Sequence, residues 1–153
     1  LVGSEMCIRD RSTDSQDFCR SVAAVMKQIG VCWNRQGGPM GDFSKVVHWV
    51  LVAMAWLTEH PLQGHRFQDR FLEFFHFCHS FSFETVSVNA MGNSPFTRRQ
   101  HNLEKPMWMP DPVNDNGNLF YRVTVLELAR IRQILGQFNM APMSHCLQIT
   151  TNL

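Results

Sequence analysis

The sequence predicts one mainly α-helical domain of about four main helices, with a short extended segment and an ordered loop before the last of them. Two observations carry this prediction. Apolar residues in three segments recur mainly at spacings of three and four, which is the period of a helix with one buried face, and a fourth segment is apolar almost all round. The 153 residues are 44% hydrophobic and 18% charged, which is enough apolar material for a packed core and too much for a disordered chain.

The first predicted helix spans Asp14–Gly30. Asp14 or Ser15 is expected to cap its start, because both side chains can accept hydrogen bonds from the N–H groups of a first turn. Gly30 is the expected stop, because glycine readily takes the left-handed conformation that ends many helices. The apolar face consists of Phe18, Val22, Val25, Met26 and Ile29.

The second predicted helix spans Asp42–Glu59 and is apolar almost all round from Val46 to Leu57. A helix without a polar face belongs at the centre of a fold. A buried strand over Val46–Val52 is the competing interpretation, because β-branched residues favour strands. The apolar run is interrupted by His48 and is shorter than the roughly 18 residues that a membrane span needs. We therefore expect no membrane partner.

The third predicted helix spans Arg66–Phe81 and follows a break at Pro61 and Gly64. Its apolar stripe consists of Phe67, Phe71, Phe74, Phe75 and Cys78. Phe83–Val88 is interpreted as a short strand or an irregular link. Ser94–Leu103 is interpreted as a short helix, because Pro95 suits a first helical turn.

An extended piece is predicted over Pro106–Pro110, followed by a turn-rich loop over Asp111–Asn118. The last predicted helix runs from about Val125 to Phe138. Thr124, with Glu127 three residues later, matches the capping-box pattern at its start. Its buried face is predicted to consist of Leu128, Ile131, Leu135 and Phe138.

The two ends of the chain are expected to lie outside this domain. Leu1–Ser12, LVGSEMCIRDRS, resembles translated sequencing-adapter sequence and has no helix or strand period. We therefore place the domain at residues 13–140 and expect the natural protein to begin further upstream. Residues 141–153 show no clear period and are expected to form a tail.

Composition and spacing narrow the possible chemistry. The net charge is only +1, so any nucleic-acid site must be local. The five cysteines show no C-x-x-C spacing, which suggests reduced thiols and a cytoplasmic protein.

His76, Cys78 and His79 lack a third and fourth ligand at a fixed spacing, so no metal site is predicted. Arg98–His101 is a small basic patch for which a solvated turn is favoured over an RNA contact. The four tryptophans are expected in the core or at its rim, and not as stacking surfaces.

The segment Lys105–Leu119, KPMWMPDPVNDNGNL, is only a rigid connector by composition. Its pattern of an extended apolar piece, DP, a polar stretch ending in Asn and a final helix resembles the end of the helical lobe in 2′–5′-oligoadenylate synthetases. The same arrangement occurs in the wider polymerase-β-like group of nucleotidyltransferases. The residues that carry the resemblance are Asp111, Pro112, Asn116 and Asn118, preceded by Lys105 and Pro106. The resemblance extends over roughly Asp14–Phe138 through the order and spacing of the helices.

The resemblance implies a nucleotide site near the first two helices. Lys27, in the helix AAVMKQI, matches a lysine that contacts the nucleotide triphosphate in that family. Ser44, at the start of the second helix, matches a residue near the triphosphate, and Lys45 adds a nearby cation where the family has an aromatic residue. Taken alone, both lysines suit a solvated surface and Ser44 suits a helix cap.

The resemblance also implies what this chain lacks. Enzymes of this group hold two magnesium ions on an Asp-x-Asp pair in a preceding β-sheet lobe, and no such pair follows a strand here. We therefore expect a fragment that holds an NTP, with ATP as the first choice, and that does not catalyse transfer alone. Mg²⁺ and the missing N-terminal lobe would complete the enzyme, and RNA is a further candidate partner. The alternatives are the central domain of a poly(A) or uridylyl polymerase, and a non-enzymatic helical interaction module.

Overall fold

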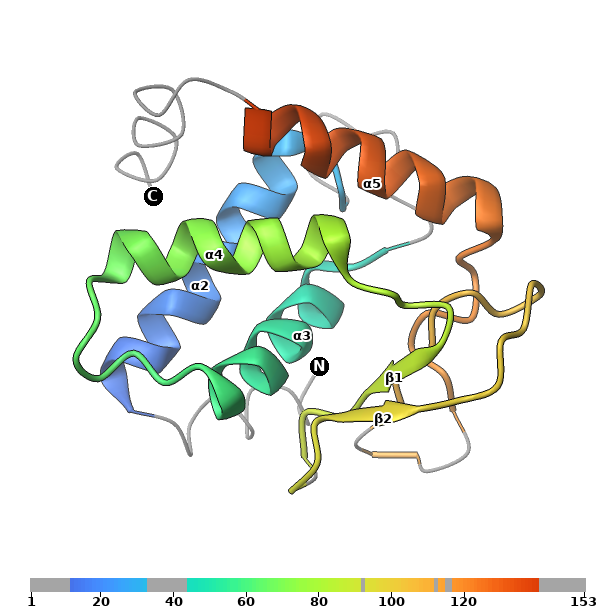
Figure 1. The fold of residues 1–153 in the computed structure, drawn as a ribbon, viewed down its shortest axis with the longest axis horizontal. Helices are drawn as coiled ribbons and strands as arrows, with labels where there is room; N and C mark the ends of the chain where they lie inside the picture. The colour runs from blue at the N-terminus through green and yellow to red at the C-terminus, as the bar shows by residue number, and fades with distance from the viewer. Residues whose placement is uncertain (1–11, 33–43, 92, 112, 115–116, 141–153) are drawn as a thin grey trace.

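The computed structural model describes residues 12–32, 44–91, 93–111, 113–114 and 117–140 (Figure 1). The described elements are α2 (Thr13–Ile29), α3 (Val46–Glu59), α4 (Phe67–Ser80), β1 (Val86–Val88), β2 (Phe96–Arg98) and α5 (Val125–Met140). The fold is therefore mainly α, with one small two-stranded sheet, as the sequence predicts. Among these residues no helix is both long enough and apolar enough to cross a membrane.

Helix α2 begins and ends through two local devices. The Ser12 hydroxyl accepts a hydrogen bond from the Ser15 N–H at 3.3 Å, so Ser12 is the N-cap, and not Asp14 or Ser15. Ser12, the last residue of the segment that resembles adapter sequence, therefore takes part in the first turn of α2. Gly30 ends the helix with φ of 88°, which confirms it as the stop. The rest of the expected tail, residues 1–11, and the expected C-terminal tail lie outside the described residues.

Helix α3 is the centre of the fold. Its residues from His48 to Leu57 are all buried, and they form a helix throughout, so the strand interpretation of Val46–Val52 is wrong. Tertiary packing explains the helix: burial of all its faces outweighs the strand preference of its β-branched residues. The predicted start at Asp42 is also too early for the helix proper, which begins at Val46.

Aromatic rings from three helices build the core. The Phe18 ring of α2 lies 6.0 Å from Trp56 of α3, and 5.4 and 5.9 Å from Phe71 and Phe74 of α4, measured between ring centroids. Phe75 continues this cluster towards α5. Each such pair adds roughly 0.5–1.5 kcal/mol to the gain from burial. The stripe predicted for the third helix is therefore the core face of α4, which is one residue shorter at each end than predicted.

The segment predicted as a helix over Ser94–Leu103 contains a strand instead. β2 pairs with β1 in antiparallel register, with Val88 opposite Phe96 and Val86 opposite Arg98. The Phe96 ring packs 5.5 Å from Phe77 at the end of α4. Pairing and this contact stabilise the extended form, and a local helix signal such as Pro95 cannot compete with them. The strand predicted within Phe83–Val88 is confirmed for β1.

Helix α5 runs antiparallel to α4 and beside it (Figure 1). Its predicted buried face is confirmed, since Leu128, Ile131, Leu135 and Phe138 are all buried. The Thr124 N–H donates to the Glu127 carboxylate at 3.1 Å, which is half of the predicted capping box.

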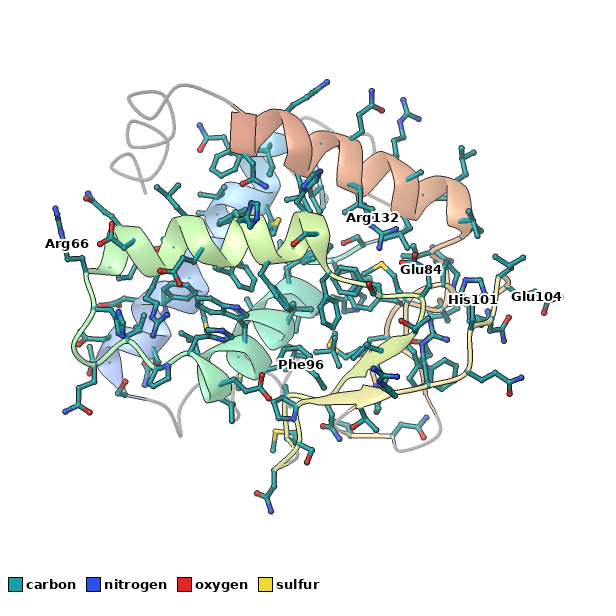
Figure 2. The ribbon with its side chains drawn as sticks, viewed as in Figure 1. Arg66, Glu84, Phe96, His101, Glu104 and Arg132 are labelled. Atoms are coloured by element: carbon teal, nitrogen blue, oxygen red, sulfur yellow. The ribbon has the colours of Figure 1, made fainter. Side chains whose placement is uncertain are left out.

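An ion pair ties α5 to the link between α4 and β1. Arg132 donates to the Phe81 carbonyl at 2.8 Å and pairs with Glu84, and Figure 2 shows the two side chains meeting at that point. Burial alone would raise the pKa of Glu84, but the hydrogen bond and charge of Arg132 outweigh it, and the pKa is lowered. The link is thereby fixed, and with it the position of the hairpin.

Candidate functional site

The predicted extended piece, Pro106–Pro110, lies beside β1 as an irregular extra strand. The Val88 N–H donates to the Trp108 carbonyl at 3.0 Å, and the Leu119 N–H donates to the Met109 carbonyl at 2.9 Å. Met107 and Met109 are fully buried, whereas Trp108 between them is only half-buried. This alternation is that of a strand with one face in the core. The predicted extended piece therefore has an inner face and an outer face.

Asn118 holds the following loop closed. Its side-chain oxygen accepts from the N–H groups of Met109 at 3.0 Å and Phe120 at 3.1 Å. Its amide nitrogen donates to the Met107 carbonyl at 3.0 Å. One carboxamide thus joins the strand before the loop to the chain after it, where Pro110 and Asn118 form an isolated bridge.

Asp111 shapes the other end of the loop. Its carboxylate accepts from the Val113 N–H at 2.9 Å, and its own N–H donates to the Gly117 carbonyl at 3.0 Å. The geometry is an Asx-turn, which gives the loop a defined shape without regular secondary structure. Pro112 and Asn116, which also carry the family resemblance, lie outside the described residues.

The exit of this loop docks on the first turn of α3. The Phe120 ring meets His48 edge-on at 5.2 Å and Trp49 at 5.8 Å, between ring centroids. His48 Nδ1 accepts from the Lys45 N–H at 3.4 Å, so the imidazole acts where a capping box normally has Glu or Gln. Burial, together with the charge of Lys45, lowers the pKa of His48 to about 4, and the charge of Asp111 acts in the opposite direction. Lys45, His48 and Asp111 therefore share one electrostatic environment.

The structure separates the predicted nucleotide-binding residues into buried and exposed groups. Ser44 is fully buried and its hydroxyl accepts a hydrogen bond from the Trp49 indole N–H. Lys45, the next residue, is exposed at the N-terminal end of α3. Lys27 is exposed in the last turn of α2. Lys27 also acts on Cys32: burial raises the pKa of that thiol to about 12, and the Lys27 charge opposes the rise.

In the basic patch Arg98–His101, Arg98, Gln100 and His101 are exposed to solvent as the sequence favours, and Arg99 is the exception. Arg99 is half-buried and its guanidinium donates to the carbonyls of Phe83 at 3.0 Å and Lys105 at 2.7 Å. Burial lowers the pKa of Arg99, and the charge of Glu84 opposes this. An arginine can satisfy several backbone carbonyls at once, which explains its place at the base of a loop.

Sequence reasoning missed a pocket beside this arginine. The pocket has a volume of about 770 Å³ and opens on the surface that carries the loop after β2. Its lining consists of Ser87, Arg99, Gln100, His101, Asn102, Leu103, Glu104 and Trp108. The one sequence signal that could have found it is the alternation of Met107, Trp108 and Met109, which turns a large aromatic ring away from the core.

The described residues do not provide a metal site. No group of three or more His, Cys, Asp or Glu side chains among them could hold an ion. Cys78 is fully buried in the α4 stripe, and burial raises its pKa. His76 is exposed on the same helix. The described residues therefore offer no group of ligands for the magnesium ions, which the family resemblance places on a preceding lobe.

No protein-family model matches the sequence, and no significant match is found among curated proteins or solved structures.

Proposed function

We propose that this chain is the helical lobe of a template-independent nucleotidyltransferase and that it binds the triphosphate of an NTP at the N-terminal end of α3. The observation that supports this most directly is the docking of the DP loop against the first turn of α3. The Phe120 ring contacts His48 there, three residues after the exposed Lys45, and the charge of Asp111 also acts on His48. Asp111, which carries the resemblance, and Lys45, the cation that stands where the family has an aromatic residue, are 66 residues apart in sequence, and both act on this one histidine.

The chemistry of the site suits a phosphate chain. The N-terminal end of a helix carries a partial positive charge, and an exposed ammonium adds a full one. His48 is neutral at pH 7 because its pKa is about 4, so Lys45 is the cation of this turn, and the nearby Asp111 carboxylate opposes its charge. Lysine suits this role because its ammonium is a mobile point charge with three donors.

The remaining predicted residues take different parts in this proposal. Lys27 is a second cation, from the last turn of α2. We give Ser44 a positioning part, since it is buried and holds the Trp49 indole beneath the first turn of α3. ATP is the expected nucleotide, and a separate lobe with metal-binding carboxylates would supply the transfer chemistry.

Binding of inorganic triphosphate to the chain tests the proposal. The ligand is titrated into ¹⁵N-labelled protein, and the backbone amides of Lys45 and His48 are followed by NMR. Lys45→Ala should weaken binding about fivefold, which corresponds to about 1 kcal/mol for an exposed ion pair. Binding should weaken as salt is added, because exposed charges are screened.

Arg66→Ala is the matched control. Arg66 is also an exposed cation at the N-cap of a 14-residue helix, α4. A general attraction of triphosphate to helix ends would make both substitutions equally harmful, and the site at α3 would then be wrong. Absence of any shift at α3 in the unsubstituted chain would favour the non-enzymatic interaction module.

A further inference from the structure

The pocket after β2 is built around a fixed loop. The Arg99 guanidinium holds the loop from both sides, through the carbonyls of Phe83 before the hairpin and Lys105 after the loop. Within the loop, the Asn102 side-chain oxygen accepts from the Glu104 N–H at 2.9 Å, and the Lys105 N–H donates to the Asn102 carbonyl at 3.2 Å. These bonds give the polar side chains of the lining defined positions, as a binding site requires.

Trp108 is the aromatic residue of the Trp, Tyr or Phe type among those that line this pocket. Its backbone carbonyl accepts from Val88, and both sequence neighbours are anchored in the core by buried methionine side chains. The indole is therefore held by its own strand and left half-buried at the pocket. An aromatic ring presented in this way loses little freedom when another ring stacks on it.

The charges of the lining argue against a phosphate ligand. Arg99 is the one permanent cation of the lining; one of its terminal nitrogens is already bonded to two backbone carbonyls, and its buried Nε–H has no hydrogen-bond partner among the described residues. Glu104 contributes a negative charge, so the permanent charges of the lining cancel. The amides of Gln100 and Asn102 offer both donors and acceptors. Such a surface suits a neutral, planar, polar ring.

We propose that this pocket binds a single nucleobase, stacked on Trp108 with its edge facing the amides of the loop. Stacking on an aromatic side chain with hydrogen bonds to the base edge is how proteins recognise unpaired bases. The volume of about 770 Å³ is large enough for a nucleoside. The proposal rests on the proposed function and adds the part of the substrate that carries no phosphate: a base of the acceptor strand. It assigns Trp108 the stacking role that the sequence alone disfavours.

Adenosine tests the pocket separately from the triphosphate site, because it has a base and no phosphate. It is titrated into ¹⁵N-labelled chain, and the Trp108 indole N–H and the backbone amides of Gln100 and Asn102 are followed by NMR. These signals should shift with a saturable curve that changes little with added salt. Trp108→Leu should weaken binding about tenfold, as expected for loss of one stacked base, and Trp108→Phe should retain most of it.

Arg66→Ala is again the control, because Figure 2 places Arg66 at the opposite end of the molecule from His101 and Glu104. Equal adenosine binding by Trp108→Leu and the unsubstituted chain would overturn the proposal that this pocket binds a nucleobase. NMR shifts confined to residues outside the pocket would overturn it as well. If Trp108→Leu does not fold, Trp108→Phe and the shift pattern of the unsubstituted chain decide the question. If the unsubstituted chain binds triphosphate but not adenosine, only this inference is wrong. If it binds adenosine but not triphosphate, only the site at Lys45 is wrong.

Discussion

Two regions of the molecule are held together by different forces. The aromatic core, which consists of Phe18, Trp56, Phe71, Phe74 and Phe75, is held by ring packing between helices. The clamped region, which consists of the described residues between 81 and 124, also buries apolar side chains against this core, and it is held in addition by side chains that bond to the backbone. Arg99, Asn118 and Arg132 each provide such bonds.

The difference matters for where function can arise. Packing is nondirectional, so the core accepts many arrangements of similar volume and leaves no polar atoms exposed to a ligand. Hydrogen bonds are directional, so each bond in the clamped region sets the direction of a particular stretch of backbone. The DP loop and the pocket both lie in this second region. The core supplies stability, and the clamped region supplies the shape of the candidate sites.

The largest expected effect is in the aromatic core. Phe74→Ala removes a fully buried ring that contacts Phe18, Trp56 and Phe75, and should lower the free energy of unfolding by about 3–5 kcal/mol. Urea titration followed by circular dichroism measures the loss. Phe67→Ala on the same helix is the control, because its ring is 38% exposed and should cost about 1 kcal/mol. Similar losses for both would show that the stripe does not pack as described.

The second largest expected effect is a loss of stability in acid that is caused by His48, which lies where the clamped region contacts α3. His48 has an unfolded pKa near 6.5 and a folded pKa of about 4, so the fold favours its neutral form. The contribution of neutral His48 to the free energy of unfolding is complete above pH 6.5 and is lost as the pH falls towards 4. The total loss is about 3 kcal/mol. Free energies of unfolding, measured from pH 7 to pH 4, should show this slope in the unsubstituted chain.

His48→Gln separates the histidine from other acid effects. A glutamine at this position can accept from the Lys45 N–H as in an ordinary capping box, and it does not titrate. The variant should therefore be less sensitive to acid than the unsubstituted chain. An unchanged slope would mean that His48 is not buried as a neutral base.

The smallest expected effect on stability, and the most local, is that of a substitution in the clamped region. Asn118→Ala removes three hydrogen bonds from the DP loop and should cost about 2 kcal/mol, because part of the loop remains accessible to water. Amide hydrogen exchange should speed up at Met109 and Phe120, the two donors to Asn118, more than in α4. Asn93→Ala, at an exposed bend, is the control. Uniform acceleration across all helices would indicate that the loop and the core unfold as one unit.

The helices and most of their buried faces could be predicted from the sequence. The stripe of α5 and the stop at Gly30 are local signals that the structure confirms. The short helix predicted around Pro95 is wrong because the Phe96 contact and pairing with β1 involve residues distant in sequence. Of the candidate site residues, Ser44 and Asp111 could be chosen by resemblance, but the contact of Phe120 with His48, from a segment distant in sequence, could not. The pocket at Trp108 could not be predicted, because its lining comes from three separate segments.

The sequence by itself determined that this protein is mainly helical, because helical periodicity is carried by residues three and four apart. It also determined which faces are buried, since burial follows side-chain chemistry. Only the tertiary structure decided that Arg99 is a clamp and that Ser44 is buried against Trp49. It also decided that Trp108 faces a pocket. The physical reason is that a polar side chain's partner depends on which distant backbone groups need a hydrogen bond once the core has formed.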